Sequence, residues 1–211
     1  MMSRMKKCNG CKGKKGIAIV ARARLPTQFG KFTIYAFCNS IDGEEHIAVV
    51  KGSVRGKSNV PLRMHSECLT GDALHSLRCD CHAQLVAAMR KIGKMQFGVV
   101  LYLRQEGRGI GITNKIRAYE LQDKGMDTVQ ANLALGLPAD GRDYEAAAEM
   151  IRELGIKSIA LITNNPAKTK DLLRHGVKVV RRIPHEFGKN KHNEGYLRVK
   201  KDKMAHILSK V

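Results

Sequence analysis

The sequence has 211 residues, 43% of them hydrophobic and 27% charged, which is the composition of a globular protein with one large domain or two small ones. It has no apolar run of membrane-spanning length and no apolar secretory segment near its start, so we expect a cytoplasmic protein without a membrane partner. The 38 Lys and Arg residues outnumber 19 Asp and Glu, and the net charge of +19 attracts nucleic acids or small phosphorylated substrates.

The first sixty residues indicate strands. Segments 16–25, 31–37 and 45–52 are short, rich in β-branched or aromatic residues, and separated by turn residues such as Asp42-Gly43. From about residue 79 helices and strands alternate, with helices expected at 81–92, 114–125, 143–155 and 166–176, and strands at 97–103, 157–163 and 177–183. We therefore predict a mixed α/β (α+β) fold, in which N-terminal antiparallel strands pack with a β-α-β alternating C-terminal portion in a single compact domain.

One stretch, HSECLTGDALHSLRCDCH (65–82), concentrates three cysteines and three histidines. Clustered cysteines in a cytoplasmic protein indicate metal binding or catalysis before disulfides. Three thiolates suit zinc, and the spacing is not that of a zinc finger. Two alternatives stay open: the cysteines alone bind and leave a catalytic position for water, or a histidine closes a structural site. The candidate fourth ligands are His65, His75 and His82.

A glycine-rich loop, RQEGRGIG (104–111), follows a predicted buried strand and leads into a helix. Glycines let the backbone approach a ligand, and arginines near a helix N-terminus favour phosphate. The dinucleotide-binding pattern is a poor match, because the third glycine comes one residue early and no acid-tipped strand follows at the required distance. We interpret the loop as a phosphate site.

Two further loops carry polar residues at turns. The segment PADGRDYE (138–145) places Asp140 and Arg142 around a glycine, and ITNNPAKT (162–169) places Thr163, Asn164 and Lys168 at a strand-to-helix switch. Taken alone, each residue is more often a cap, a turn or a solvated charge. Ligands bind at such switches in open α/β sheets, so the loops together with a metal indicate a nucleotide site.

From about Ala21 to the C-terminus the chain closely resembles GTP cyclohydrolase II, the enzyme that opens riboflavin synthesis. The matching stretches, in order, are RLPTQFGKF, RMHSECLTGDALHSLRCDC, LYLRQEGRGIGITNKIRAYELQDKG, DTVQANLALGLPADGRDYE, LITNNPAKT and YLRVKKDKMAHIL. The resemblance implies hydrolysis of GTP to formate, pyrophosphate and 2,5-diamino-6-(5-phosphoribosylamino)pyrimidin-4(3H)-one. It also implies one Zn²⁺ per chain, Mg²⁺ with the triphosphate, and a homodimer, with no nucleic acid partner.

The resemblance also implies roles for individual residues. Zinc ligands would be Cys68, Cys79 and Cys81. Asp140 would accept a proton, Arg142 would attack the α-phosphate, and Tyr119 would lie near the reacting ring. GTP contacts would be Arg63, Met64, His65, Ser66, Glu67, Gln84, Glu106, Gly107, Arg108, Thr128, Thr163 and Lys168.

Physical chemistry qualifies two of these roles. A guanidinium is protonated at working pH and has no free lone pair, so a clamp on phosphate charge is an easier role for Arg142 than nucleophilic attack. Three thiolates make zinc a mild Lewis acid, so a neighbouring group should assist at the ring. The candidates are Glu67 and Tyr119.

Parts of the chain lie outside the resemblance or depart from it. We divide the chain into a basic flexible extension (1–16), the catalytic domain (17–195) and a basic C-terminal helix or tail (196–211). Cys8-x-x-Cys11 has metal-ligand spacing without a second pair, and we expect two free thiols there. His82 stands where the family has a small residue, and we expect it to face solvent rather than bind the metal.

Two rival functions remain at this stage. One is a basic zinc-containing RNA-binding protein, which the absence of Trp and an aromatic content of 5% disfavour. The other is a family member that performs only part of the reaction. The presence of Tyr119, Asp140 and Arg142 favours the full reaction.

Overall fold

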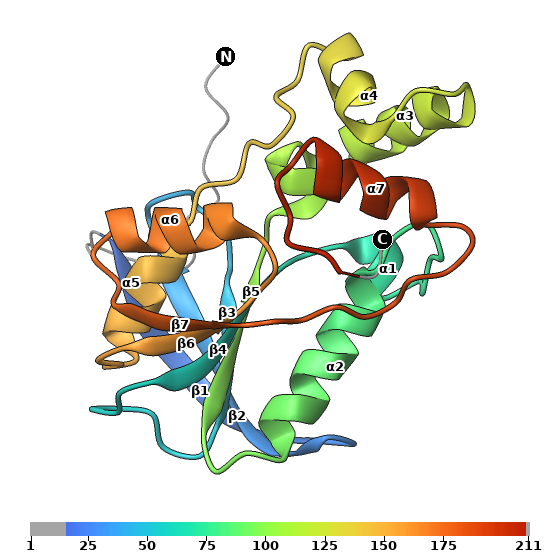
Figure 1. Cartoon of the computed structure of the whole chain (residues 1–211). Coiled ribbons are helices and arrows are strands. Elements are labelled where there is room, and N and C mark those ends of the chain that lie inside the picture. Colours follow the sequence, from blue (N-terminus) through green and yellow to red (C-terminus); the bar gives the residue numbers. More distant parts are fainter. Residues whose placement is uncertain (1–15, 210–211) are drawn as a thin grey trace.

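The structure is a computed structural model that describes residues 16–209. Within these residues one seven-stranded mixed sheet has the order β1-β2-β3-β5-β4-β6-β7 (Figure 1). The strands are β1 (Ile17–Thr27), β2 (Gly30–Asn39), β3 (Ile47–Lys51), β4 (Val60–Ser66), β5 (Gly98–Leu103), β6 (Ile159–Ile162) and β7 (Val179–Ile183). The helices are α1 (Leu69–Asp72), α2 (Cys81–Gly93), η2 (Glu106–Gly109), α3 (Gly111–Asp123), α4 (Thr128–Ala134), α5 (Glu145–Glu153), α6 (Pro166–Arg174) and α7 (Glu194–Asp202).

The sheet joins an antiparallel half to a parallel half, which confirms the predicted fold class. Strands β1, β2 and β3 pair antiparallel, and β3 pairs antiparallel with β5. Strands β5, β4, β6 and β7 are parallel. Parallel neighbours need crossover connections, and the alternating helices of the second half supply them.

The core is divided by the sheet into two layers. Successive side chains of a strand point to opposite faces, so Val99 and Leu101 of β5 pack with α5 and α6, whereas Val100 packs with α2. Figure 1 shows α5 and α6 together on one side and α2 on the other. Both faces are buried, which explains the nearly continuous apolar run of β5.

Besides the four-residue helices α1 and η2, strand β4 and helix α4 were not predicted from the sequence. Strand β4 lies in the middle of the sheet, but Pro61 and the polar residues Arg63 and His65 interrupt its apolar pattern. Helix α4 begins with a capping box between Asp127 and Gln130 inside a segment for which no element was expected.

Among the described residues no helix is long and apolar enough to span a membrane. The expectation for Cys8 and Cys11 concerns residues outside the described part.

The connections of the parallel strands create one favoured position for a ligand. Strand β4 leads through α2 to β5, and β5 leads back through α5 to β6 on the other side of β4. At such a switch the two connections leave on opposite faces, and a crevice opens at the carboxyl ends of the strands. Strands β4, β5 and β6 end at Ser66, Leu103 and Ile162, each followed directly by a polar loop.

Candidate functional site

A cleft of about 1200 Å³, measured to its open mouth, lies at this edge of the sheet. The residues expected from the sequence that line it are Arg63, His65, Ser66, Glu67, Cys68, Cys79, Cys81, Gln84, Glu106, Gly107, Arg108, Tyr119, Thr128, Arg142, Thr163 and Lys168. Two expected residues do not line the cleft. Met64 is fully buried in the core, and Asp140 pairs with the cleft-lining Arg142 without lining the cleft itself.

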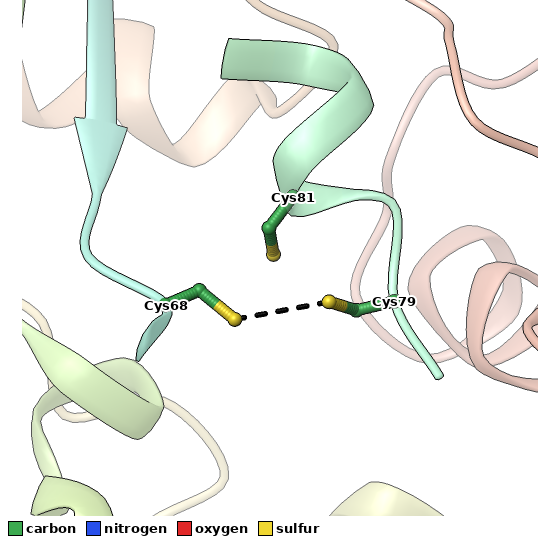
Figure 2. A group of neighbouring side chains, drawn as sticks. All are labelled: Cys68, Cys79 and Cys81. Atoms are coloured by element: carbon green, nitrogen blue, oxygen red, sulfur yellow. Dashed lines mark hydrogen bonds between the residues drawn. The ribbon is translucent and has the colours of Figure 1, made fainter. Parts of the chain in front are cut away.

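The three clustered cysteines meet at the cleft (Figure 2). Cys68 follows β4, while Cys79 and Cys81 lie just before and at the start of α2, and the three Sγ atoms lie within 4.8 Å of one another. The Sγ atoms of Cys68 and Cys79 are 3.7 Å apart. Tetrahedral zinc with bonds of about 2.3 Å separates its sulfur ligands by about 3.8 Å, so this donor set fits a zinc ion.

The short helix α1 folds the chain tightly against this cluster. A Cβ atom at Gly71 would lie 2.9 Å from Cys79 Sγ, closer than real Cβ contacts allow, and 3.1 Å from Cys68 Sγ. Asp72 then accepts a hydrogen bond from the Cys68 backbone N–H at 3.1 Å. The LTGD turn therefore needs glycine at this position, because the sulfur atoms occupy the space of a side chain.

No histidine joins the sulfur atoms in the described part of the chain. The imidazole rings of His75 and His82 contact each other, with centroids 4.0 Å apart. His65 donates from Nε2 to Asp72 at 2.9 Å, and Tyr102 donates to the same carboxylate at 2.9 Å. Of the two alternatives, this geometry favours a site with three protein ligands over one closed by histidine.

Tyr119 lies near the cluster, as expected for a residue that assists at the ring. Its hydroxyl is 3.4 Å from Thr70 Oγ1, which is 3.7 Å from Cys68 Sγ. The guanidinium of Arg78 lies 4.5 Å from the centroid of the tyrosine ring and contributes a cation–π contact. The other candidate, Glu67, accepts a hydrogen bond from Arg104 Nε at 2.7 Å. Tyr119 thus lies beside the cysteine cluster through Thr70, whereas the Glu67 carboxylate is paired with Arg104.

Several cations line the rest of the cleft, and the terminal nitrogens of one of them, Arg108, have no acceptor within the described protein. Arg108 has both terminal nitrogens buried without a partner, in a left-handed backbone conformation with φ of 63°. Buried N–H groups require acceptors, and a guanidinium is well suited to phosphate oxygens. The side chains of Arg63, Arg142 and Lys168 face the same cleft. This part of the site is chemically suited to a polyanion.

Burial and neighbouring positive charges both disfavour the charged form of Lys168. It is buried at the start of α6, and its Nζ donates to the Met64 carbonyl at 2.9 Å. Burial, followed by the charges of Arg63 and Arg142, lowers the pKa of Lys168 well below its ordinary value. A bound anion would relieve this repulsion.

The C-terminal segment contributes residues that sequence reasoning treated only as a basic helix or tail. Tyr196 and Lys200 of α7, together with His206, line the cleft. Lys200 Nζ lies 2.6 Å from Asp80 Oδ1, and Asp80 stands between two of the clustered cysteines. The matching stretch YLRVKKDKMAHIL was the sequence signal that could have identified this contribution.

Two asparagines beside the cleft serve the fold, as their positions at a helix start suggested. Asn165 caps α6, accepting a hydrogen bond from the Ala167 backbone N–H at 2.9 Å. Asn164 exchanges two hydrogen bonds with the backbone of His185, each 2.9 Å long. Their polar groups therefore hold the loop after β6 in place.

Known proteins are similar in sequence to this chain over most of its length. The family model for GTP cyclohydrolase II matches residues 18–184. A GTP cyclohydrolase-2 from Picrophilus torridus is 52% identical over 192 residues, covering 91% of this chain and 100% of that protein. A GTP cyclohydrolase-2 from Aeromonas hydrophila is 52% identical and covers 92% of this chain and 98% of its own.

Two other matches cover only part of the protein concerned. The riboflavin biosynthesis protein RibBA of Endomicrobium trichonymphae is 52% identical over 94% of this chain, but over 49% of its own length. A solved two-domain 3,4-dihydroxy-2-butanone 4-phosphate synthase from A. baumannii has a TM-score of 0.39 at 16% identity, covering 72% of this chain and 35% of that one. The family match and the full-length relatives agree, and the chain belongs to the GTP cyclohydrolase II family.

Proposed function

We propose that this chain hydrolyses GTP to formate, pyrophosphate and 2,5-diamino-6-(5-phosphoribosylamino)pyrimidin-4(3H)-one, the first step of riboflavin biosynthesis. Membership of the family supports the proposal. The observation that carries it is the convergence of three cysteine sulfurs at one end of a cleft whose remaining charged lining is mainly Lys and Arg. A metal site for ring chemistry and a cationic site for a triphosphate thus share one cavity.

We propose zinc as the metal, held by Cys68, Cys79 and Cys81. A zinc ion held there would supply a Lewis acid able to activate water for hydrolysis of the imidazole ring of guanine. Tyr119 is positioned through Thr70 at this end of the cleft, where its hydroxyl can hydrogen-bond to the purine. His65 lines the same region, and its Nδ1 is buried without a protein partner, which makes it an acceptor for a substrate N–H or O–H.

The phosphate end of the substrate would lie against the cations of the cleft. Arg108 offers two unpartnered nitrogens, and Arg142 presents a guanidinium held by Asp140. These groups stabilise the negative charge that develops when the α–β phosphoanhydride breaks. A magnesium ion would enter with the triphosphate, since Mg²⁺ is commonly bound through substrate phosphates. Both Arg142 and Lys168 therefore belong to the proposed phosphate subsite.

One assay tests this proposal and separates it from its rivals. The purified protein is mixed with GTP and MgCl₂, formate and pyrophosphate are followed by nuclear magnetic resonance, and zinc is measured by elemental analysis. We expect both products in equal amounts and one zinc per chain. Formate without pyrophosphate would indicate a protein that performs part of the reaction. Neither product, with tight RNA binding, would support a zinc-containing RNA-binding protein instead.

We also propose a homodimer, as the resemblance implies, and a cytoplasmic location. Apolar side chains that remain exposed on and near helices α3 and α4 support the dimer, since such groups favour association. They are Ile112, Ile116, Met126 and Leu133. Sedimentation analysis of the purified protein tests it, and a monomer at micromolar concentration would contradict it.

A further inference from the structure

A buried lysine touches the metal-binding cysteines. Lys115 lies on α3, its side chain is only 10% exposed, and its Nζ is 3.2 Å from Cys68 Sγ. The distance and the chemistry are those of an ammonium group that donates a hydrogen bond to a thiolate. Neither the cysteine spacing nor the glycine-rich loop indicated this residue.

The loop that precedes α3 holds this lysine in place. Glu106 Oε1 lies 2.8 Å from Lys115 Nζ, and the same carboxylate accepts hydrogen bonds from the backbone N–H groups of Leu69 and Gly107 at 2.5 and 2.8 Å. Leu69 follows Cys68 directly. Glu106 therefore fixes the ammonium and the cysteine-bearing turn relative to each other.

A glycine makes room for the lysine stem. A Cβ atom at Gly107 would lie 3.2 Å from Lys115 Cβ and 2.9 Å from Ile110 Cγ1. Gly107 also has φ of 62°, a conformation that glycine adopts without cost. The approach of Lys115 to the sulfur thus depends on the shape of the loop, as well as on the attraction of opposite charges.

The positive charge of Lys115 counteracts the strong electron donation of three thiolate ligands. Three thiolates and one Zn²⁺ carry a net charge of −1, and their electron donation weakens the metal as a Lewis acid. A hydrogen bond to a ligand sulfur withdraws electron density from that ligand, and groups outside the ligand set commonly tune metal sites in this way. The ammonium also separates the thiolate from the Glu106 carboxylate, whose charge would otherwise act on the same sulfur.

We propose that Lys115 is a positioning residue that tunes the metal site through its hydrogen bond to Cys68. This inference deepens the proposed function and rests on the zinc site described there. Without the ammonium, Cys68 becomes a stronger donor and its position relative to the other sulfurs is less well determined. Ring opening should then fall because the metal is a weaker Lewis acid, and metal affinity should fall because the poorer positioning of the sulfur outweighs its stronger donation. We expect each to drop by about 10- to 100-fold, the usual effect of losing such a partner.

The test compares Lys115→Met and Lys115→Gln, which remove the charge, with Lys115→Arg, which keeps a cationic donor. Each protein is loaded with Co²⁺, and the sulfur-to-cobalt charge-transfer absorption is recorded beside the zinc affinity and the rate of formate release. Loss of the hydrogen bond raises the energy of the sulfur electrons, so the absorption should move to longer wavelength in the neutral variants. In Lys115→Arg it should return toward the wild-type position.

The matched control is Lys124→Met, which removes an exposed lysine at the end of the same helix. It should leave the absorption, the zinc affinity and the formate rate unchanged. A folded Lys115→Met or Lys115→Gln protein with the wild-type absorption and wild-type zinc affinity would overturn the proposal. A purely structural role for Lys115 would lower stability without moving the absorption.

A measurement on the wild-type protein covers the case in which neither neutral variant folds. With ¹⁵N-lysine and ¹¹³Cd in place of zinc, we expect one slowly exchanging ammonium group whose protons couple to cadmium through Cys68. Absence of such a group would also overturn the proposal. These spectra do not depend on GTP, so a wild-type protein with the spectral signature but without formate release would refute the proposed function alone.

Discussion

Arg142 donates two parallel hydrogen bonds to Asp140, 2.8 Å from Nε to Oδ1 and 2.5 Å from the terminal nitrogen to Oδ2. Burial alone would lower the pKa of Arg142, but Tyr144 and the Asp140 carboxylate outweigh it and hold that pKa above the ordinary value. The guanidinium is therefore firmly protonated. This arrangement supports a clamp on phosphate charge and makes nucleophilic attack by Arg142 difficult.

We predict that Arg142→Lys loses pyrophosphate release although the positive charge is kept. An ammonium cannot make two parallel hydrogen bonds with Asp140 while facing the substrate, and loss of one such donor typically costs about 100-fold in rate or more. Pyrophosphate release from GTP measures the effect. Arg174→Lys, which alters a largely exposed arginine paired with Asp171, is the control. Near-normal release by Arg142→Lys would contradict both the bidentate and the covalent roles.

Removing Lys200 from its ion pair with Asp80 should lower the stability of the fold far more than removing Lys203 from its pair with Asp127. The carboxylate of Asp80 is 2% exposed, and replacing Lys200 with Met leaves it buried with Gln84 as its remaining side-chain partner. Removing one partner of a buried pair costs about 3–5 kcal/mol. We therefore predict a clear loss of stability for Lys200→Met in urea unfolding, together with weaker metal retention.

Lys203→Met provides a matched control for this prediction. Lys203 also lies 2.6 Å from an aspartate, Asp127, but its side chain is 48% exposed. An exposed pair contributes about 1 kcal/mol or less. Equal losses in the two variants would show that burial of the Asp80 carboxylate does not matter.

We predict that His82→Ala leaves the rate of formate release nearly unchanged. His82 contacts the ring of His75, and it is not among the groups that come within 4.8 Å of the three sulfur atoms. Steady-state assays with GTP provide the measurement. A large gain in rate would mean that His82 blocks the metal in the wild-type protein.

Stability should fall as the pH is lowered, and His185 should account for a definable part of the change. Burial, reinforced by the charge of Arg63, lowers the pKa of His185 to about 3, whereas the unfolded chain has a pKa of about 6.5. Between these values the unfolded state binds a proton that the folded state excludes. The stabilisation of the fold that comes from neutral His185 is therefore complete above pH 6.5 and is lost progressively as the pH falls toward 3.

His185→Gln isolates this contribution. Glutamine does not titrate, and it can still donate a hydrogen bond to the Gln84 carbonyl that His185 contacts at 2.8 Å. Urea unfolding between about pH 4 and 7 should give a shallower decline in the variant, by up to about 1.4 kcal/mol for each pKa unit of the shift. If the free energy of unfolding fell equally with pH in the wild-type protein and in the variant, the low pKa of His185 would be contradicted.

The strands and helices were predictable where the local pattern was regular. The hairpin strands, β5 and the helices α2, α5 and α6 follow hydrophobic periodicity and end near glycine or asparagine, as neighbouring residues dictate. Strand β4 was not predicted, because its cleft-facing side chains include Arg63 and His65. Polar residues that serve the site broke the apolar pattern by which buried strands are recognised.

The amino-acid sequence by itself determined the family, most of the secondary structure and the three cysteines that meet at the cleft. Only the tertiary structure decided which charges face those cysteines. Lys115 contacts Cys68 across 47 positions of sequence, and Lys200 reaches Asp80 across 120. Local patterns arise from neighbours along the chain, whereas the packing of α3 and α7 over the cysteine loop depends on how distant segments fit together.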